Sequence, residues 1–369
     1  MTISCTFSLA LCLSLALPAC AMEPDGDAPQ PDESLGEVTS DITIVPGGWE
    51  TSTYFTGNTY RGGQVTYLDG INYVVRVGSC GSVLCGTGED AHQLTWSTVS
   101  STGAVTDNGN ITAPGGVWQG ADSKVSLAAF NGYVYMLHTG ADSSSDTYLS
   151  RLNPATQSWT QRKIPFTSFG GPPAIAAYNG KLYLVGITSS HSIWYATMDT
   201  GENFTPLVTI GGYSSASRVS ATVAFGKLWI THRQGTTHDI VYSTFDGTTW
   251  SATTDIFGGD NNGVLQGDEP VIGFDGSFIR LVHQRPGSGY LWNIVYNGCK
   301  WSTAETSIGT RSSSLPPSLS QSTKGLAMIT ESDNPNSLFG YAYWASLAFY
   351  DRPSPILNCN VTLPGGPLL

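Results

Sequence analysis

The sequence predicts an all-β protein made of one repeated unit. A glycine in a tight turn precedes an apolar stretch six times along the chain, at Gly70, Gly132, Gly180, Gly226, Gly276 and Gly325. Asn-Gly or Asp-Gly before such a stretch is a strong signal for a β-hairpin. No segment shows the 3.6-residue period of an amphipathic helix, and β-branched and aromatic residues dominate the apolar stretches.

Each repeat contains three or four candidate strands. A third stretch, rich in aromatic residues, follows each hairpin, as at Ile193 to Tyr195, and a short fourth stretch ends most repeats, as at Trp159 and Trp250. The turn glycines are 46 to 50 residues apart, except for one interval of 62 that holds the segment GSCGSVLCGTGED. Four strands in about 40 to 50 residues are typical of a β-propeller blade. We therefore expect a six-bladed propeller of four-stranded blades.

The two ends of the repeat array are expected to meet. The last repeat lacks a clear fourth strand, whereas Gly47 to Asn58, ahead of the first repeat, reads like Gly247 to Asp260. An open ring would leave a row of unpaired backbone groups at its edge. We therefore expect the N-terminal strand to complete the sixth blade and close the ring, within one domain spanning residues 41–369.

The first 40 residues are predicted to lie outside this domain. Residues 1–19 end in the apolar run Leu9 to Ala19, which is too short to cross a bilayer as a helix and is typical of a signal peptide. The sequence LPAC ending at Cys20 resembles a bacterial lipobox, in which Cys20 would be acylated and would tether the protein to a membrane. The alternative is an ordinary signal peptide cut near Ala19, which would release the protein. Residues 20–40 are acidic and rich in proline, as in a solvated tether.

This N-terminal segment predicts that the protein is exported, either as a cell-surface or outer-membrane lipoprotein or as a secreted protein.

Beyond Cys20, the chain has four cysteines, Cys80, Cys85, Cys299 and Cys359. An even number in an exported protein favours two disulfides, with Cys80 and Cys85 closing one loop and Cys299 left to reach Cys359. Free buried thiols are the alternative, and no spacing of cysteine or histidine indicates zinc.

Charge and motifs exclude several functions. The chain has 28 Asp and Glu against 16 Lys and Arg, a net charge of -12, so no basic surface for nucleic acid is expected. No phosphate loop, dinucleotide fingerprint or Gly-x-Ser-x-Gly elbow occurs. No cofactor is expected. Calcium is the alternative, at the acidic loops Asp142 to Asp146 and Asp260 to Gly263, although neither loop has the alternating oxygen spacing of known calcium loops. The oligomeric state stays open.

One repeat carries a family resemblance. The segment PPAIAAYNGKLYLVGITSSHSIWYATMDTGENF, from Pro172 to Phe204, resembles the repeats of bacterial and fungal β-propeller lectins, including the fucose-binding type, and the resemblance extends over about Gly47 to Val361. In those lectins, sugars lie between neighbouring blades, held by aromatic faces and by Arg, Glu or similar groups. The resemblance implies that this chain binds a glycan or glycoconjugate at pockets between blades. Propellers host many unrelated functions, so the ligand stays open.

Polar residues recur near the end of the second strand of the repeats. Six residues after the turn glycine stand Arg76, His138, Gly186, His232 and Glu331, and the fifth repeat has His283 one residue later. Sugar sites combine hydrogen-bonding side chains with an aromatic face, because sugar hydroxyls need partners and sugar C–H faces are apolar. The candidate ligand-binding residues are His138, His232, Arg233, His283, Gln284, Arg285, Trp194, Tyr195, Tyr242 and Trp292.

Two alternatives apply to these candidates. The aromatic residues also suit the spaces between blades, and the histidines also suit a hydrogen-bonded core. Neutral imidazole is a common metal ligand, but the three histidines belong to second strands rather than to the innermost ones, so no metal site is expected.

A glycoside hydrolase is the alternative function. Thr197 to Phe204 fits the S/T-x-D-x-G-x-x-W/F pattern of the Asp box in sialidase propellers, which is a structural hairpin. A glycosidase needs two carboxyl groups flanking the bond. The candidates, at the starts of innermost strands, are Asp122, Asp268 and Glu269, and Arg218 with Arg233 would hold an acidic sugar. A non-catalytic scaffold for protein interaction is the third hypothesis.

Overall fold

The computed structural model describes most of the repeat region and none of the first 52 residues. The described residues are 53–54, 59–78, 94–112, 125–140, 146–166, 173–234, 239–256, 268–284, 290–302, 305–312, 316–322, 325–333 and 343–351. The predicted signal peptide, tether, Cys20, Cys80, Cys85, Cys359, Asp122, Arg285 and most of both acidic loops lie outside this set. The predicted domain boundaries stay predictions.

Four of the sheets are antiparallel and have four strands each, in chain order. The first consists of β6 (Ser126–Phe130), β7 (Tyr133–Thr139), β8 (Thr147–Asn153) and β9 (Ser158–Lys163). The second consists of β10 (Ala174–Tyr178), β11 (Lys181–Ile187), β12 (Ser192–Met198) and β13 (Val208–Ser214). The third consists of β14 (Ser220–Ala224), β15 (Lys227–Arg233), β16 (Ile240–Phe245) and β17 (Thr254–Asp255). The fourth consists of β18 (Asp268–Phe274), β19 (Ile279–Gln284), β20 (Tyr290–Tyr296) and β21 (Thr306–Ser312).

The fifth sheet has eight strands and combines the two ends of the repeat array. From the last repeat come β22 (Ser318–Ser322), β23 (Gly325–Asp333) and β24 (Tyr343–Asp351). From the first repeat come β2 (Thr59–Leu68), β3 (Ile71–Gly78), β4 (Leu94–Val99) and β5 (Val105–Asn110). The short β1 (Thr53–Tyr54) pairs with β24.

The expectation of six separate sheets is therefore wrong: the described strands form five. Thr59 of β2 pairs with Tyr343 of β24, and this single pair joins the first and last repeats into one hydrogen-bonded sheet. The N-terminal strand does add to the last repeat, with Thr53 opposite Leu347 and Tyr54 opposite Ser346.

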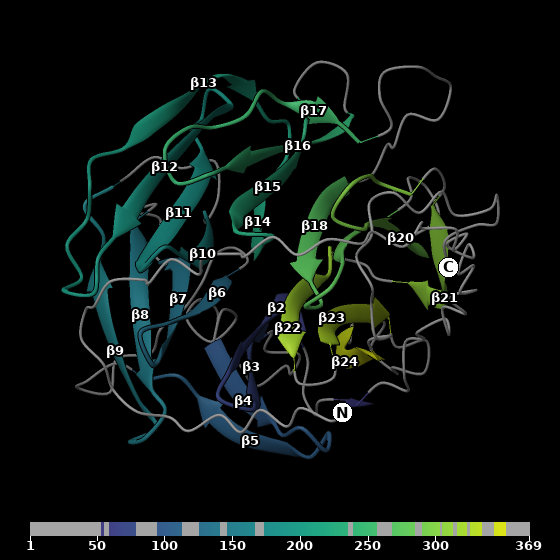
Figure 1. The fold of residues 1–369 in the computed structure, drawn as a ribbon. Helices are drawn as coiled ribbons and strands as arrows, with labels where there is room; N and C mark the ends of the chain where they lie inside the picture. The colour runs from purple at the N-terminus through teal and green to yellow at the C-terminus, as the bar shows by residue number, and fades with distance from the viewer. Residues whose placement is uncertain are drawn as a thin grey trace, which may run out of the picture. The chain divides into compact units, whose positions relative to one another are not determined.

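The first strand of every repeat lies on the inside of the arrangement, as Figure 1 shows for β2, β6, β10, β14, β18 and β22. Each of these strands contacts the next one, and β22 contacts β2. Four-stranded antiparallel sheets around such a ring are typical of a β-propeller. The ring brings together the starts of segments that are far apart in the sequence.

Backbone conformation at the turns explains why the hairpins form where the sequence predicts them. Asp69 and Gly70 have φ values of 49° and 87°, and Asn131 and Gly132 have values of 50° and 76°. A type I′ turn needs a positive φ at both central residues, which Asp, Asn and Gly tolerate.

Apolar side chains fill the space between neighbouring sheets. One cluster joins Leu94 of β4 to Val134 of β7 and Trp159 of β9, all buried. Another joins Leu137 of β7 to Leu184 of β11. Within the described ranges no residue is helical, and hence no helix there is long and apolar enough to cross a membrane.

Candidate functional site

Four of the recurrent polar residues of the second strands are buried: Arg76, His138, His232 and His283. His138 on β7 is 1% exposed, and its Nε2 lies 3.2 Å from Ser150 Oγ and 3.1 Å from Gln161 Nε2. Its ring stacks on Tyr148 of β8, with 5.8 Å between ring centroids. The same position in the first repeat holds Arg76, which is also buried. A buried polar group thus bonds to the third and fourth strands of its own sheet.

His232 and His283 are equally buried. Burial lowers the pKa of His232 to about 4, although a backbone hydrogen bond at Arg233 raises it slightly. His283 Nε2 lies 3.6 Å from Glu305 Oε2. Arg233 and Gln284, at the ends of β15 and β19, are half-buried. A ligand role for these residues stays a prediction.

The candidate aromatic residues pack against other side chains. Trp194 is 1% exposed and covers Gly186, where an added Cβ would lie 2.7 Å from the indole Cζ2. Tyr195 packs against Trp250, and Tyr242 stacks on Trp229, with centroid distances of 5.8 and 5.4 Å. Trp292, in β20, is half-buried. These rings therefore help to join strands and sheets.

A groove between the first two repeats offers the chemistry of a sugar site. This interblade groove has a volume of about 550 Å³ and is lined by Trp96, Asn108, Asn110, Thr112, Gln157, Ser158 and Trp159. The two indoles are almost fully buried and meet edge to face, with 6.0 Å between ring centroids. Asn110, Thr112, Gln157 and Ser158 are exposed at its rim.

A β-bulge shapes one wall of this groove. Thr95 pairs with Asn110 and Ser97 pairs with Asp107, so Asn108 and Gly109 both lie opposite Trp96. Gly109 has a φ of 77°, which a non-glycine residue rarely adopts. A bulge re-aims the side chains of its strand. The polar residues of this groove were not among the predicted ligand-binding residues, although Asn108 and Gly109 form a turn-type pair and Trp159 marks a fourth strand.

The first strands surround a second cavity, the axial pocket, with a volume of about 90 Å³. Its lining includes Arg218, just before β14, and Glu269 on β18. Burial lowers the pKa of Arg218, and the negative charge of Glu269 opposes that shift. Of the three predicted catalytic carboxylates, the structure thus places Glu269 at this pocket. Asp268 begins β18, and Asp122 lies outside the described residues.

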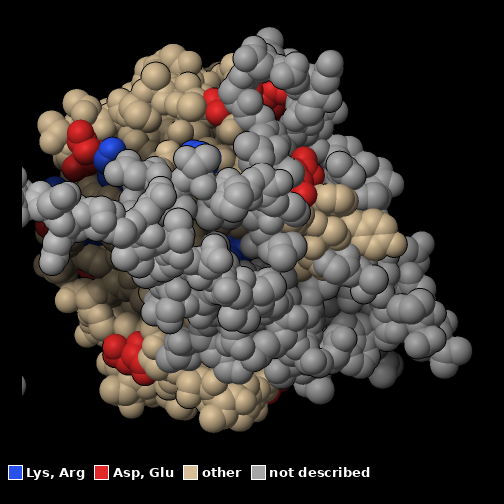
Figure 2. All heavy atoms as spheres, turned by 45° about the vertical axis from the view of Figure 1, so that its right-hand side comes forward, with Lys and Arg blue, Asp and Glu red and all other residues tan. Residues whose placement is uncertain are grey.

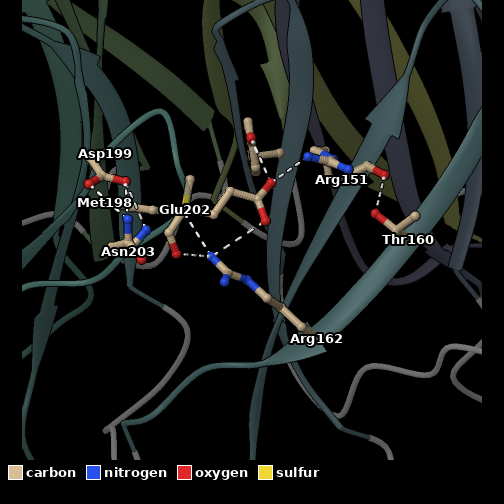
Figure 3. Close-up of polar contacts among 8 residues, drawn as sticks. Arg151, Thr160, Arg162, Met198, Asp199, Glu202 and Asn203 are labelled. Carbon is tan, nitrogen blue, oxygen red and sulfur yellow. Dashed lines mark hydrogen bonds and ion pairs between the residues drawn. The ribbon is translucent and has the colours of Figure 1, made fainter.

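A group of hydrogen bonds and ion pairs around Glu202, shown in Figure 3, connects the second repeat to the third. Glu202, in the predicted Asp-box turn, accepts hydrogen bonds from Arg151 (2.7 Å) and Tyr135 (3.1 Å) of the preceding sheet. Arg162 donates to the Glu202 carbonyl over 2.7 Å and lies 3.7 Å from its carboxylate. Burial and the Glu202 charge raise the pKa of Tyr135 to about 12. We call these four residues the Glu202 clamp.

Removing the charge of Glu202 is expected to have a modest effect on the stability of the protein. Glu202→Gln keeps the shape of the side chain and removes its charge, and we expect the free energy of unfolding to fall by about 1 kcal/mol. The loss is small because Arg151 and Arg162 are 35% and 38% exposed, so solvent screens both pairs. Urea unfolding measures the change. Asp146→Asn, which removes the more exposed pair with Lys163, is the control and should cost less.

Among the described residues, no group of three or more His, Cys, Asp or Glu side chains is placed to hold a metal ion. Cys299 is disulfide-bonded. The other three cysteines of the predicted framework lie outside the described residues, so the pairing stays a prediction.

The fold is similar to several solved propellers of low sequence identity. A GH93 α-L-arabinofuranosidase of Fusarium graminearum has a TM-score of 0.57 and 9% identity, over 82% of this chain and 98% of that chain. A Trypanosoma rangeli sialidase has a TM-score of 0.55 and 9% identity, over 79% and 55%. The SapL1 lectin has a TM-score of 0.50 and 12% identity, over 77% and 88%. No protein-family model and no curated protein matches the chain. These similarities establish the fold alone.

Proposed function

We propose that this protein is a carbohydrate-binding β-propeller that holds a neutral glycan in the interblade groove. The observation that carries the proposal is the composition of that groove: exposed amides and hydroxyls line it together with two buried indoles, and none of the described lining residues is charged. Amide groups both donate and accept hydrogen bonds, as sugar hydroxyls require. The apolar indole edges suit the C–H groups of a sugar ring.

The similar structures support a sugar ligand. One is a lectin in complex with α-methyl fucoside, another an arabinofuranosidase in complex with arabinobiose, and a third a sialidase in complex with an inhibitor. The surface also suits a neutral ligand, because the described residues visible in Figure 2 carry scattered charges of both signs and no large basic patch. We propose further that the protein is exported and that Cys20 carries its membrane tether.

A glycoside hydrolase is the second candidate function, with Glu269 at the axial pocket as a candidate carboxylate. Hydrolysis of a glycosidic bond uses a pair of carboxyl groups. Among the described lining residues of the axial pocket, Glu269 is the single carboxylate.

A glycan array followed by calorimetry tests the proposal. Gln157→Ala and Asn110→Ala should each weaken binding of the best glycan by about fivefold, because each removes hydrogen bonds to the ligand. Gln321→Ala is the matched control, because Gln321 is an exposed glutamine of β22 that does not line the groove. An intact fold without binding to any glycan, or equal effects of Gln157→Ala and Gln321→Ala, would contradict the proposal.

A further inference from the structure

The axial pocket is a separate cavity whose charged groups the proposed glycan site does not use. Its described lining comes from residues in or just before all six first strands. Among those lining residues, the charged side chains are Arg218 and Glu269, one of each sign, and the remainder are apolar or carry a hydroxyl or amide.

The uncharged polar groups of the wall tie neighbouring first strands together. Ser318 Oγ donates to Gln64 Oε1 over 3.0 Å and accepts a hydrogen bond from the amide of Val65 over 3.3 Å. Ser220 Oγ accepts a hydrogen bond from the amide of Ile272 over 3.1 Å. These hydrogen bonds join β22 to β2 and β14 to β18, so neighbouring strands of the pocket wall are linked to each other. A wall held together by hydrogen bonds keeps the shape of the pocket, which lowers the cost of binding a ligand.

Glu269 is held in an unusual backbone conformation at this wall. Asp268 pairs with Gln284 and Val271 with Val282, so Glu269 and Pro270 both lie opposite His283 in a β-bulge. Glu269 has a φ of 42°, in the left-handed region. Such a conformation is unfavourable for a non-glycine residue and is found preferentially at ligand sites. The bulge therefore stabilises a placement of Glu269 that a regular strand would not give.

We propose that the axial pocket binds a small zwitterion, a free α-amino acid with a short side chain, whose carboxylate meets Arg218 and whose ammonium meets Glu269. A guanidinium fork matches a carboxylate, and a carboxylate accepts the hydrogen bonds of an ammonium group. The site is distinct from the interblade groove, so the proposal does not depend on the glycan ligand.

Charge and size distinguish this ligand class from others. A ligand that carries only a carboxylate is attracted by Arg218 and repelled by Glu269. A ligand that carries only an ammonium group is attracted by Glu269 and repelled by Arg218. The volume of about 90 Å³ is that of a pocket for a small ligand. The burial that lowers the pKa of Arg218 also strengthens its interaction with a bound anion.

Calorimetric titration of the full chain with alanine, propionate, ethylamine and fucose tests the proposal. Alanine should bind at least about tenfold more tightly than propionate or ethylamine, because it satisfies both charges. In Glu269→Gln, alanine should bind more weakly and propionate more tightly than in the wild type. Arg218→Gln should lose both ligands, and Lys300→Gln, at an exposed lysine outside the pocket, should change neither.

Several results would overturn the proposal. Binding of alanine no tighter than that of propionate, or absence of alanine binding, would leave Arg218 and Glu269 as a structural ion pair. Binding of fucose that alanine displaces would assign the pocket to the glycan. Because the comparison of ligands uses the wild-type protein, it decides the question even if Arg218→Gln does not fold. Groove variants such as Gln157→Ala test the glycan proposal separately.

Discussion

Asp275→Ala is expected to lower the free energy of unfolding by about 3 to 5 kcal/mol, because it leaves a buried guanidinium without its carboxylate. Arg280 Nε lies 3.2 Å from Asp275 Oδ2, and the two side chains are 3% and 0% exposed. Arg280 also donates to Asn293 Oδ1 over 3.3 Å. Equilibrium unfolding in urea measures the loss.

Asp246→Ala provides a matched control for this variant. Asp246 Oδ1 accepts hydrogen bonds from two backbone amides of its turn, at Thr248 and Thr249, as Asp275 does at Ser277 and Phe278. Asp246 is exposed, so its loss removes the turn contacts without stranding a buried charge. Its effect should be much smaller.

A double variant separates the ion pair from the turn. Asp275→Ala combined with Arg280→Met should recover much of the lost stability, since a buried ion pair is often replaceable by apolar groups at little cost. Equal losses in Asp275→Ala and Asp246→Ala would show that the ion pair contributes nothing.

Acid should destabilise the protein through His232, by about 3 kcal/mol between neutral pH and pH 4. Burial lowers the pKa of His232 to about 4 in the folded protein, against an ordinary histidine pKa of 6.5. The unfolded chain therefore binds a proton more readily in this window. The stability that neutral His232 contributes is complete above about pH 6.5, falls as the pH drops toward 4, and is lost below that value.

His232→Leu should remove this component of the acid dependence. The measurement is the free energy of unfolding at pH 7 and near pH 4 for wild type and variant. Thr231→Val is the control, because Thr231 is a buried neighbour on β15 that carries no titratable group. It should change stability equally at both pH values. An unchanged acid dependence in His232→Leu would show that another group is responsible.

Local sequence determined the hairpins. Asn-Gly and Asp-Gly pairs supply the positive φ values that the turns require, as at Asn179 and Gly180, with φ values of 46° and 70°. The alternation of apolar residues then fixes the register, because a shift by one residue would turn the apolar face toward water. The strand ahead of the first repeat was also predicted to join the last one, and Thr53 opposite Leu347 confirms it.

The candidate sites depended on contacts between distant segments. The spacing of His138, His232 and His283 predicted recurrent positions, but their burial is set by the neighbouring strands of each sheet. The groove rim at Asn110 and Gln157 combines two repeats, and the Asn-Gly pair at Asn108 and Gly109 forms a bulge there instead of a hairpin turn.

By itself the sequence determined the repeat, its hairpins and the N-terminal strand that joins the last repeat, because turn conformation and apolar alternation are local properties. Tertiary structure alone decided that the end repeats merge into one sheet through Thr59 and Tyr343, and that Arg218 faces the same pocket as Glu269. The physical reason is that the first strands pack in a ring, which brings together residues about fifty or more positions apart in the sequence. The burial and the charged neighbours of such residues depend on these distant contacts, so no local sequence pattern predicts them.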